Sequence, residues 1–278
     1  MKPDTVTKLK NSLIQHGPLS SRIYLMKLDA ADLPGIIDEL DVLAHDNEYG
    51  KIFAKIPTVH EKEFTTRGYV VEAEVPRFFG GKTTLVMVSK FKDTRRAESA
   101  MGEKGKHIVE QARQAAKNPP HVHLRPEYTC AACTGEDVDE MAAIYRQVFE
   151  SYPFPILDPS FLRAGMAEDT AYYGVRHEGR LVALASAEID REDLNAELTD
   201  FATIPEYRRK GLARYLLDTA EEHLRKIGII MGYTIARAAS RGMNTVFAQR
   251  GYAYGGTLVR NTNICGRIED MNVWYKPL

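Results

Sequence analysis

The sequence is poor in cysteine, in long apolar runs and in any excess of charge. Its three cysteines are an odd number, too few for a disulfide framework in 278 residues. The N-terminal stretch MKPDTVTKLKNSLIQHG contains no apolar run typical of a signal peptide, and no segment reaches the length of a membrane span. The formal net charge of −1 gives no overall field that attracts nucleic acid or an anionic membrane. We therefore expect a cytoplasmic protein with neither kind of partner.

Cys130 and Cys133 form a C-x-x-C pair downstream of His121 and His123. Four such side chains could bind zinc. The stretch EYTCAACT, however, is typical of a short strand, in which residues three apart point to opposite faces and cannot bind one ion together. We expect no metal site and interpret both cysteines as small apolar strand residues.

The composition allows two domains. Apolar residues make up 44% of the chain and charged residues 27%, as in globular proteins with a sizeable core. A polar segment with one helical pattern, GKHIVEQARQAAK, and a Pro-Pro stop divides the chain. We predict an N-terminal domain over residues 1–92, a linker helix within 93–125 and a second domain over 126–278.

In the second domain, patterns typical of strands and helices alternate. Strands are predicted in YTCAACT, AYYGVRHEGRLVALASAEID (a hairpin), NAELTDFATI, IIMGYTIARA and the C-terminal pair, and helices in DVDEMAAIYRQVFESY, PSFLRAGM, GLARYLLDTAEEHLRKIG and GMNTVFAQRG. The strongest helix has an apolar face formed by Leu212, Leu216, Ala220, Leu224 and Ile227. This order predicts a mixed α/β domain with strands in both directions.

A basic turn begins that helix. Pro205 ends the preceding strand, and the turn then contains Arg208, Arg209, Lys210, Gly211, Leu212 and Ala213. Unpaired N–H groups and the helix dipole favour an anion at such a place, and small residues let a phosphate approach the backbone. The turn is neither a Walker A loop nor a G-x-G-x-x-G turn. It is either a diphosphate site or a basic turn that only begins a helix.

The pattern Arg208-x-x-Gly211-x-Ala213, preceded by IPEY and a strand, resembles the acetyl-CoA-binding signature of the GNAT N-acetyltransferases. The order of elements from about residue 126 to 278 is similar to their fold. The resemblance implies acetyl-CoA as co-substrate, with its pyrophosphate on the amides of the turn. It also implies that the pantetheine arm follows a bulged strand at Phe201, Ala202 and Thr203.

Further segments resemble the β-lysine N-acetyltransferases, which acetylate the ε-amine of β-lysine to make the osmolyte Nε-acetyl-β-lysine. They are SYPFPILDP, ARAASRGMN, RGYAYGGTL, EDMNVWYK and the N-terminal EYGKIFAKIP and GYVVEAEVPRFFGG. The similarity covers most of the chain and implies a small amine as acceptor and a compatible solute of osmotic stress as product. Two alternatives stay open: a GNAT enzyme for another amine or a protein lysine, and a non-catalytic acyl-CoA-binding sensor.

Acetyl transfer to an amine needs a base, because an alkylammonium group titrates near pH ~10.4 and cannot attack while protonated. The resemblance implies Glu197 as this base, with Glu188 and Asp200 as alternatives. Phe247 occupies the position at which many GNAT enzymes carry a tyrosine that protonates the leaving thiolate. A phenyl ring cannot donate a proton, so the donor would be water or one of Tyr233, Tyr252 and Tyr254.

The remaining predicted contacts concern the two substrates. Asn244 is expected to hydrogen-bond the pantetheine arm or to cap its helix, and Phe247 to line the cofactor site. Tyr152 and Phe154 lie in a loop where GNAT enzymes often bind acceptors. Arg237 or Arg260 is predicted to bind the carboxylate of an amino-acid acceptor.

The hexapeptide FTTRGY at residues 64–69 has a near-copy, FAQRGY, at 247–252. Ungapped alignment brings residues 52–69 onto 235–252, and upstream RIYLMKL and DLPGIIDELDVLAHD repeat a strand and a helix. The junction DAADLP is acidic and lacks the Arg-x-x-Gly turn. We predict a smaller, truncated GNAT-like α/β domain without a CoA site that covers the acceptor side; chance similarity is the alternative. A homodimer is compatible with the sequence.

Overall fold

The computed structural model describes residues 4–121 and 123–278. The N-terminal half contains β1 (Thr5–Leu9), β2 (Ser12–Gly17), β3 (Arg22–Lys27), α1 (Gly35–Asp46), β4 (Lys51–Pro57), α2 (Glu61–Thr65), β5 (Val70–Phe79) and β6 (Thr83–Phe91). After α3 (Glu103–Ala115), the C-terminal half contains β7 (Tyr128–Ala132), α4 (Val138–Val148), α5 (Pro159–Ala167), β8 (Thr170–His177), β9 (Arg180–Asp190), β10 (Asn195–Thr203), α6 (Leu212–Lys226), β11 (Met231–Arg237), α7 (Arg241–Gln249), β12 (Ala253–Ile264) and β13 (Arg267–Pro277).

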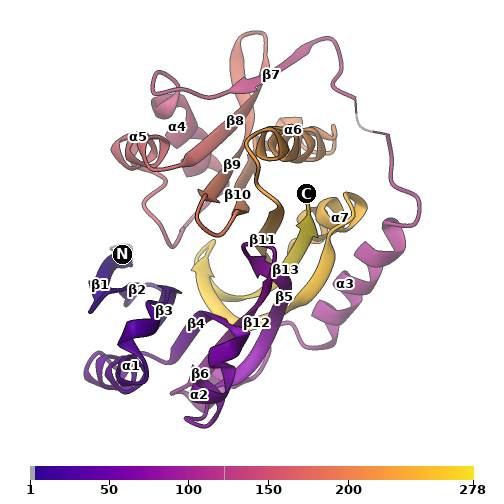
Figure 1. Ribbon diagram of the computed structural model, residues 1–278. Helices are drawn as coiled ribbons and strands as arrows, with labels where there is room; N and C mark the ends of the chain where they lie inside the picture. Colours follow the sequence, from indigo (N-terminus) through magenta and orange to yellow (C-terminus); the bar gives the residue numbers. More distant parts are fainter. Residues whose placement is uncertain (1–3, 122) are drawn as a thin grey trace.

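The strands of the described residues form one continuous curved sheet (Figure 1). Its order is β1-β2-β3-β4-β6-β5-β12-β13-β11-β10-β9-β8-β7, so the two halves of the chain meet where β5 pairs with β12. Most neighbours are antiparallel, but β3 with β4 and β10 with β11 are parallel. The predicted mixed α/β fold is confirmed.

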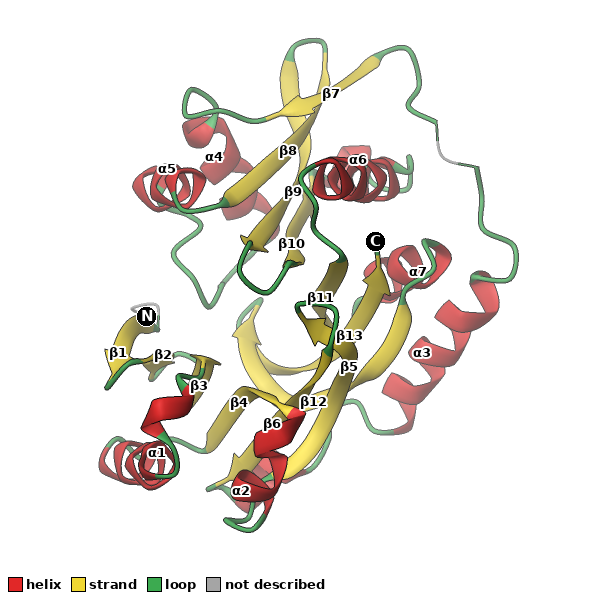
Figure 2. Cartoon of the chain, viewed as in Figure 1, coloured by secondary structure: helices red, strands yellow, loops and turns green. Residues whose placement is uncertain are grey.

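Helices cover both faces of the C-terminal half of the sheet (Figure 2). Helix α6 lies on one face of β8, β9 and β10, and α4 with α5 lies on the other. The alternation along β9 explains this, because Ala183, Ala185 and Ala187 pack toward α6 whereas Leu184 between them packs toward α4 and α5. Cys130 and Cys133 also face these two different cores, as the strand pattern predicted.

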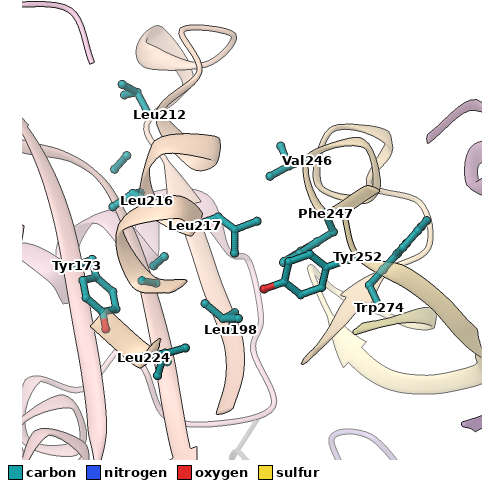
Figure 3. Packing of buried hydrophobic residues seen from close by; sticks show 14 of the residues in the cluster. Tyr173, Leu198, Leu212, Leu216, Leu217, Leu224, Val246, Phe247, Tyr252 and Trp274 are labelled. Atoms are coloured by element: carbon teal, nitrogen blue, oxygen red, sulfur yellow. The ribbon is translucent and has the colours of Figure 1, made fainter. Parts of the chain in front are cut away.

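The predicted apolar face of α6 is confirmed. Leu212, Leu216, Ala220 and Leu224 are all buried, and Leu217 extends the same face (Figure 3). Figure 3 shows Leu217 on the side of α6 that faces Phe247 and Tyr252, with Trp274 beyond them in the same core. The amphipathic pattern therefore fixes α6 on the sheet and places its N-terminus at one edge of the cavity described below.

The N-terminal half repeats the connectivity of the C-terminal half. The order β1-β2-β3-β4-β6-β5 corresponds to β8-β9-β10-β11-β13-β12, with α1 matching α6 and α2 matching α7. In each half the third and fourth strands are parallel and joined through a helix. Counterparts of β7, α4 and α5 do not occur among the described N-terminal residues, so the first unit is the shorter one.

The two similar hexapeptides form the same turn in the two halves. In the first, Tyr69 N donates a hydrogen bond to Phe64 O (3.3 Å), and the two rings pack edge to face at 5.1 Å. In the second, Tyr252 N donates to Phe247 O (3.1 Å), and the rings lie 5.2 Å apart. The glycine of each turn has a positive φ. The repeated sequence thus encodes repeated backbone geometry.

Helix α3 lies beside α7, within the segment predicted as a linker (Figure 1). Val109 and Ala112 of α3 are buried in the same core as α6 and α7. Among the described residues no helix has the length and apolarity that crossing a bilayer would require.

The hairpin of β1 and β2 is not indicated by the sequence pattern. Four of the five residues of β1 are exposed, so the strand has no alternation of apolar and polar residues to mark it.

The two halves are joined at β5 and β12 by strand pairing and, beside it, by a buried ion pair. Gly256 pairs with Ala73 at this join. Beside it, Lys51 Nζ lies 2.7 Å from Glu72 Oε2 and donates to Val259 O at 2.7 Å, while Val259 N donates to Glu72 Oε1. Apolar residues of both halves share one core beneath these contacts. The halves therefore form one packed unit.

We expect Gly256→Val to weaken this join. Gly256 has φ of 145°, and a Cβ there would lie 2.2 Å from the Glu72 carbonyl oxygen and 2.7 Å from Ala73 Cα. The free energy of unfolding should fall by about 2 kcal/mol or more, lowering Tm by roughly 5 °C. Gly242→Ala in α7 is the control, because no atom lies within 4 Å of a Cβ there. An unchanged Tm for Gly256→Val would contradict the prediction.

Candidate active site

The site begins where β10 and β11 stop pairing. The two strands pair in parallel over three residues, ending at Glu197 opposite Tyr233. Strand β10 also carries a bulge between Thr199 and Ala202, where Asp200 has φ of 53°. The bulge lies in the strand in which the sequence predicted one. Backbone groups of both strands are thereby released from the sheet and face a shared space.

A cavity of about 830 Å³ occupies this space. Its wall includes residues of β10, β11 and α7, the turn before α6, and the loop after α4. Strands β3 and β4 of the N-terminal half, together with residues of β9, β12 and β13, complete it. The cavity therefore extends from the N-terminus of α6 to the N-terminal half of the chain, and both halves build it.

The basic turn lies at one end of the cavity. Arg208, Arg209, Gly211, Leu212 and Ala213 line it. Gly211 is the N-cap of α6 with φ of 83°, and no atom lies within 4 Å of where a Cβ would be. Since glycine has no side chain to cap the helix, the first N–H groups of α6 are available to an anion.

Two other predicted cofactor contacts lie outside the cavity wall. The ammonium group of Lys210 lies 4.7 Å from the ring centroid of Tyr207 and does not line the cavity. Ala202 is buried in the core on the α4 side of the sheet, whereas its neighbours Phe201 and Thr203 do line the cavity.

Asn244 is not at the cavity. It is fully buried, and its Nδ2 donates to the carbonyl oxygens of Arg237 and Ser240. Its Oδ1 accepts hydrogen bonds from Asn272 Nδ2 (2.8 Å) and Trp274 Nε1 (2.9 Å). The amide is therefore already paired within the protein. The N-cap of α7 is Ser240, whose Oγ accepts from Met243 N, so the helix-cap alternative for Asn244 is wrong.

Phe247 lines the cavity, and its ring packs edge to face against Phe201 at 5.6 Å. The three tyrosines considered as proton donors in its place, Tyr233, Tyr252 and Tyr254, all lie outside the cavity wall. Tyr254 OH is hydrogen-bonded to Thr257 Oγ1 (2.5 Å). Tyr233 OH accepts a hydrogen bond from Lys55 (3.1 Å).

Three carboxyl groups line the middle of the cavity: Glu188, Glu197 and Asp200. Glu188 and Glu197 face each other across the β9–β10 pairing. The deep position of Glu188 and the charges of Glu197 and Asp200 raise the pKa of Glu188 to about 8, although its side chain is exposed to solvent within the cavity. This solvent access weakens the shift, but its direction leaves Glu188 as the member of the pair that holds a proton near neutral pH.

Glu197 differs from Glu188 in having a cationic neighbour. The pKa of Glu197 is raised overall, because burial outweighs the lowering by the charge of Lys55 and by hydrogen bonding from Tyr233 and the Ile235 backbone. Burial opposes the charge on Lys55, yet Tyr233, Tyr24 and Glu197 raise its pKa well above the ordinary value. Lys55 therefore stays charged and favours the ionised form of Glu197.

Asp200 accepts a hydrogen bond from the loop predicted to bind the acceptor. Tyr152 OH donates to Asp200 Oδ1 (2.5 Å), and Ser186 Oγ donates to Oδ2 (2.6 Å). Burial raises the pKa of Asp200, and these two hydrogen bonds oppose the rise. Tyr152 and Phe154 both line the cavity, so the structure brings the predicted acceptor loop to the predicted carboxylates.

The two arginines predicted for the acceptor carboxylate are placed differently. Arg237 lines the cavity, but its Nη2 lies 2.6 Å from Glu269 Oε1 and its charge is thereby balanced. Arg260 is outside the cavity wall, and its Nε donates to the Glu98 carbonyl oxygen (2.8 Å).

The prediction that the N-terminal domain covers the acceptor side identified none of the residues that this domain contributes to the wall. Arg22, Tyr24, Met26, Phe53 and Lys55, on β3 and β4, all line the cavity. A usable signal was present, since both strands are largely apolar runs, RIYLMK and IFAKIP, that each contain a basic residue with little or partial exposure. Buried cations in apolar strands are rare unless they are paired or functional.

Comparison with known proteins agrees with this geometry. Residues 138–252 match the acetyltransferase (GNAT) family. The chain is 34% identical over 273 residues to the beta-lysine N(6)-acetyltransferase of Methanococcus maripaludis, covering 98% of each chain. It is 32% identical over 263 residues to the protein of that name from Methanosarcina mazei, covering 87% of this chain and 97% of the other. It is 29% identical over 267 residues to N-acetyltransferase YodP of Bacillus subtilis, covering 96% of each.

The separated strands, the bulge and the helix with its basic turn define an acyltransferase site. The chain belongs to the GNAT acetyltransferase family and is an N-acetyltransferase. The predicted family and its similarity to the β-lysine acetyltransferases are confirmed. Enzymes of this family use acetyl-CoA, and the Gly211 turn has the space and the unpaired N–H groups that a diphosphate requires. No group of metal-binding side chains occurs among the described residues.

We expect Glu188→Gln to change how stability depends on pH. The folded protein holds a proton on Glu188 that the unfolded chain releases near pH 4.5, so this group destabilises the fold as pH rises from about 4.5 to 8. Glutamine removes that dependence. Because solvent in the cavity screens the charge, we expect Tm of the variant relative to wild type to rise by only roughly 2 °C between pH 5 and pH 9.

Glu192→Gln is the matched control, since Glu192 is exposed at the end of the same hairpin. Its Tm should follow wild type at both pH values. A Glu188→Gln variant whose Tm differs from wild type by the same amount at pH 5 and pH 9 would show that Glu188 is ionised throughout.

Proposed function

We propose that the protein transfers an acetyl group from acetyl-CoA to the ε-amine of β-lysine, giving Nε-acetyl-β-lysine. The supporting observation is the similarity, at 34% and 32% identity, to two proteins named beta-lysine N(6)-acetyltransferase. The first similarity covers 98% of each chain, so it includes the N-terminal strands that line the cavity. A role in making a cytoplasmic compatible solute under osmotic stress is part of this proposal.

In this proposal the pyrophosphate of acetyl-CoA lies at the N-terminus of α6, with Arg208 and Arg209 beside it. Both guanidinium groups are exposed, and Arg208 Nε donates to Thr203 O at 3.2 Å, which turns it toward β10. The pantetheine arm follows the bulged part of β10 along Phe201 and Thr203. Phe247 forms the apolar wall beside it.

Acetyl-CoA supplies the thioester carbonyl that the amine attacks. Glu197 accepts a proton from the ammonium group and so releases the nucleophile. Lys55 and Tyr233 favour the ionised form of Glu197 against the effect of burial, while the raised pKa of Glu188 favours its protonated form. Phe247 offers no proton to the leaving thiolate, which has an ordinary pKa of about 8.5 and can leave as the anion or take a proton from water.

We further propose that residues 1–92 form a GNAT-like unit that has no CoA site and covers the acceptor end. In this unit the junction between β3 and α1 carries Asp29 and Asp32 where the C-terminal unit carries arginines. Asp32 Oδ2 accepts hydrogen bonds from Ser12 N and Oγ, so the first unit has a carboxylate at the corresponding turn. Residues 93–125 connect this unit to the catalytic unit, 126–278.

Thiol release from acetyl-CoA tests the proposed function. With β-lysine we expect release and a product acetylated on the ε-amine, identified by NMR. L-Lysine, spermidine and a lysine-containing peptide should react more slowly by kcat/KM. Release with the peptide but not with β-lysine would contradict the proposal, and no release with any amine would favour an acyl-CoA sensor.

We expect Glu197→Gln to lower kcat at pH 7 by about 10²-fold or more, because glutamine cannot accept the ammonium proton. The KM for acetyl-CoA should stay within about twofold, since the basic turn is untouched. Glu192→Gln should leave both constants unchanged. If Glu197→Gln retained the wild-type kcat, another group would have to be the base.

A further inference from the structure

The charges around the cavity leave one buried cation without an anionic partner. Apart from the arginines of α6, its preceding turn and the start of α7, the cations of the described cavity wall are Arg22, Lys55 and Arg237. Arg237 is paired with Glu269. Lys55 is only partly buried and contacts the Tyr233 hydroxyl, and the charge of Glu197 raises the pKa of both Lys55 and Arg22. Arg22 forms no ion pair with a carboxylate in residues 4–121 and 123–278.

The hydrogen bonds of Arg22 are only partly used. Its Nη1 donates to Asn261 O (2.8 Å) and Thr262 Oγ1 (2.8 Å), and its Nη2 donates to Gln15 Oε1 (3.3 Å). A guanidinium group has five N–H donors, so the Nε donor and one donor on Nη2 remain. The Nε atom is buried and has no partner among the described residues. Two neighbouring donors of this kind match the two oxygens of a carboxylate.

The surroundings of Arg22 favour the binding of a ligand carboxylate. Only 3% of Arg22 is exposed, and burial lowers its pKa to about 10, so it remains charged at neutral pH. Its guanidinium carbon lies 5.2 Å from the ring centroid of Tyr24 and 5.9 Å from that of Phe53. An isolated buried charge is costly, and a ligand carboxylate would offset that cost.

The same corner of the cavity contains an unused acceptor. Asn261 lines the cavity, is 1% exposed and has an Oδ1 with no partner in the described part of the chain. Its backbone oxygen already binds Arg22. A cationic donor and a neutral acceptor side by side resemble the complement of an amino-acid head group, which carries a carboxylate next to an ammonium group.

Arg22 and Glu197 are separated by aromatic and cationic side chains. Lys55 Nζ lies 5.5 Å from the ring centroid of Tyr24 on which Arg22 also packs, and it donates to Tyr233 beside Glu197. An acceptor with its amine at Glu197 and its carboxylate at Arg22 must therefore carry the two groups at opposite ends of a chain. Gln15, a partner of Arg22, also donates to Pro153 O (2.9 Å) and so connects this corner to the acceptor loop.

We propose that Arg22, on the N-terminal half, binds the carboxylate of the acceptor and selects amino acids over simple diamines. This inference rests on the proposed function, since it takes the acceptor to be a diamino acid acetylated on its distal amine. It also gives the N-terminal half a chemical task in addition to covering the site. Arg22 is a specificity-determining residue and takes no part in proton transfer.

The test compares β-lysine with 1,4-diaminopentane, which is β-lysine without its carboxylate. For the wild-type enzyme we expect kcat/KM to be about 100-fold higher with β-lysine. Arg22→Gln should lower kcat/KM for β-lysine by about 50-fold or more, mainly through KM, and change that for 1,4-diaminopentane less than threefold. Arg22→Lys keeps the charge but loses the paired donors, so it should recover part of the preference.

Arg96→Gln is the matched control. Arg96 is also a buried arginine with an unpartnered Nε, but it donates to the carbonyl oxygens of Ser20 (2.9 Å) and Arg260 (2.6 Å) and lies outside the cavity wall. It should lower stability without altering the ratio of kcat/KM for the two acceptors.

The outcomes separate the two proposals. Equal losses on both acceptors in Arg22→Gln would assign Arg22 a structural role and overturn the inference, while β-lysine acetylation by the wild type would still support the proposed function. Equal use of both acceptors by the wild type would overturn the inference even if no Arg22 variant folds. Failure of the wild type to acetylate β-lysine would overturn the proposed function and this inference with it.

Discussion

Pairing between β10 and β11 stops after Glu197, and the cavity exists because of this separation. A parallel pair that continued to the ends of both strands would bring their side chains together and close the space. The bulge at Asp200 has a related effect, because it releases β10 from β9 over two residues and turns a carboxylate toward Tyr152. The α6 N-terminus at one end and β3 with β4 at the other can then face a common volume.

The three carboxyl groups that line this cavity each have different charged and hydrogen-bonding neighbours. Burial raises the pKa of each, and neighbouring charges and hydrogen bonds modify that rise differently in the three. Lys55 favours ionised Glu197, while the neighbouring charges favour protonated Glu188. The cation that biases this pair comes from β4 of the N-terminal half. The electrostatics of the cavity therefore depend on both halves of the chain.

Much of this arrangement could be predicted from the sequence, because strong local signals carry it. The apolar face of α6, the glycine-containing basic turn and the two copies of the RGY turn are encoded within short segments. Asn244 shows why other residues could not be predicted. Its type suits a cofactor contact, yet the indole of Trp274 and the amide of Asn272, distant in sequence, occupy its oxygen. Whether Arg22 or Arg260 lines the cavity likewise depends on which strands are neighbours in the sheet. Local sequence patterns do not predict that strand order.

The pairing of β5 with β12 has a consequence beyond the packing of the two halves. Because α3 and its flanking segments connect the halves covalently, this contact is intramolecular. Tethered partners meet at an effective concentration on the order of millimolar, whereas separate subunits dissociate as they are diluted. A wall that two separate chains would complete only when abundant is here present in every molecule. The part of the cavity wall that β3 and β4 form is thus independent of how much protein the cell contains.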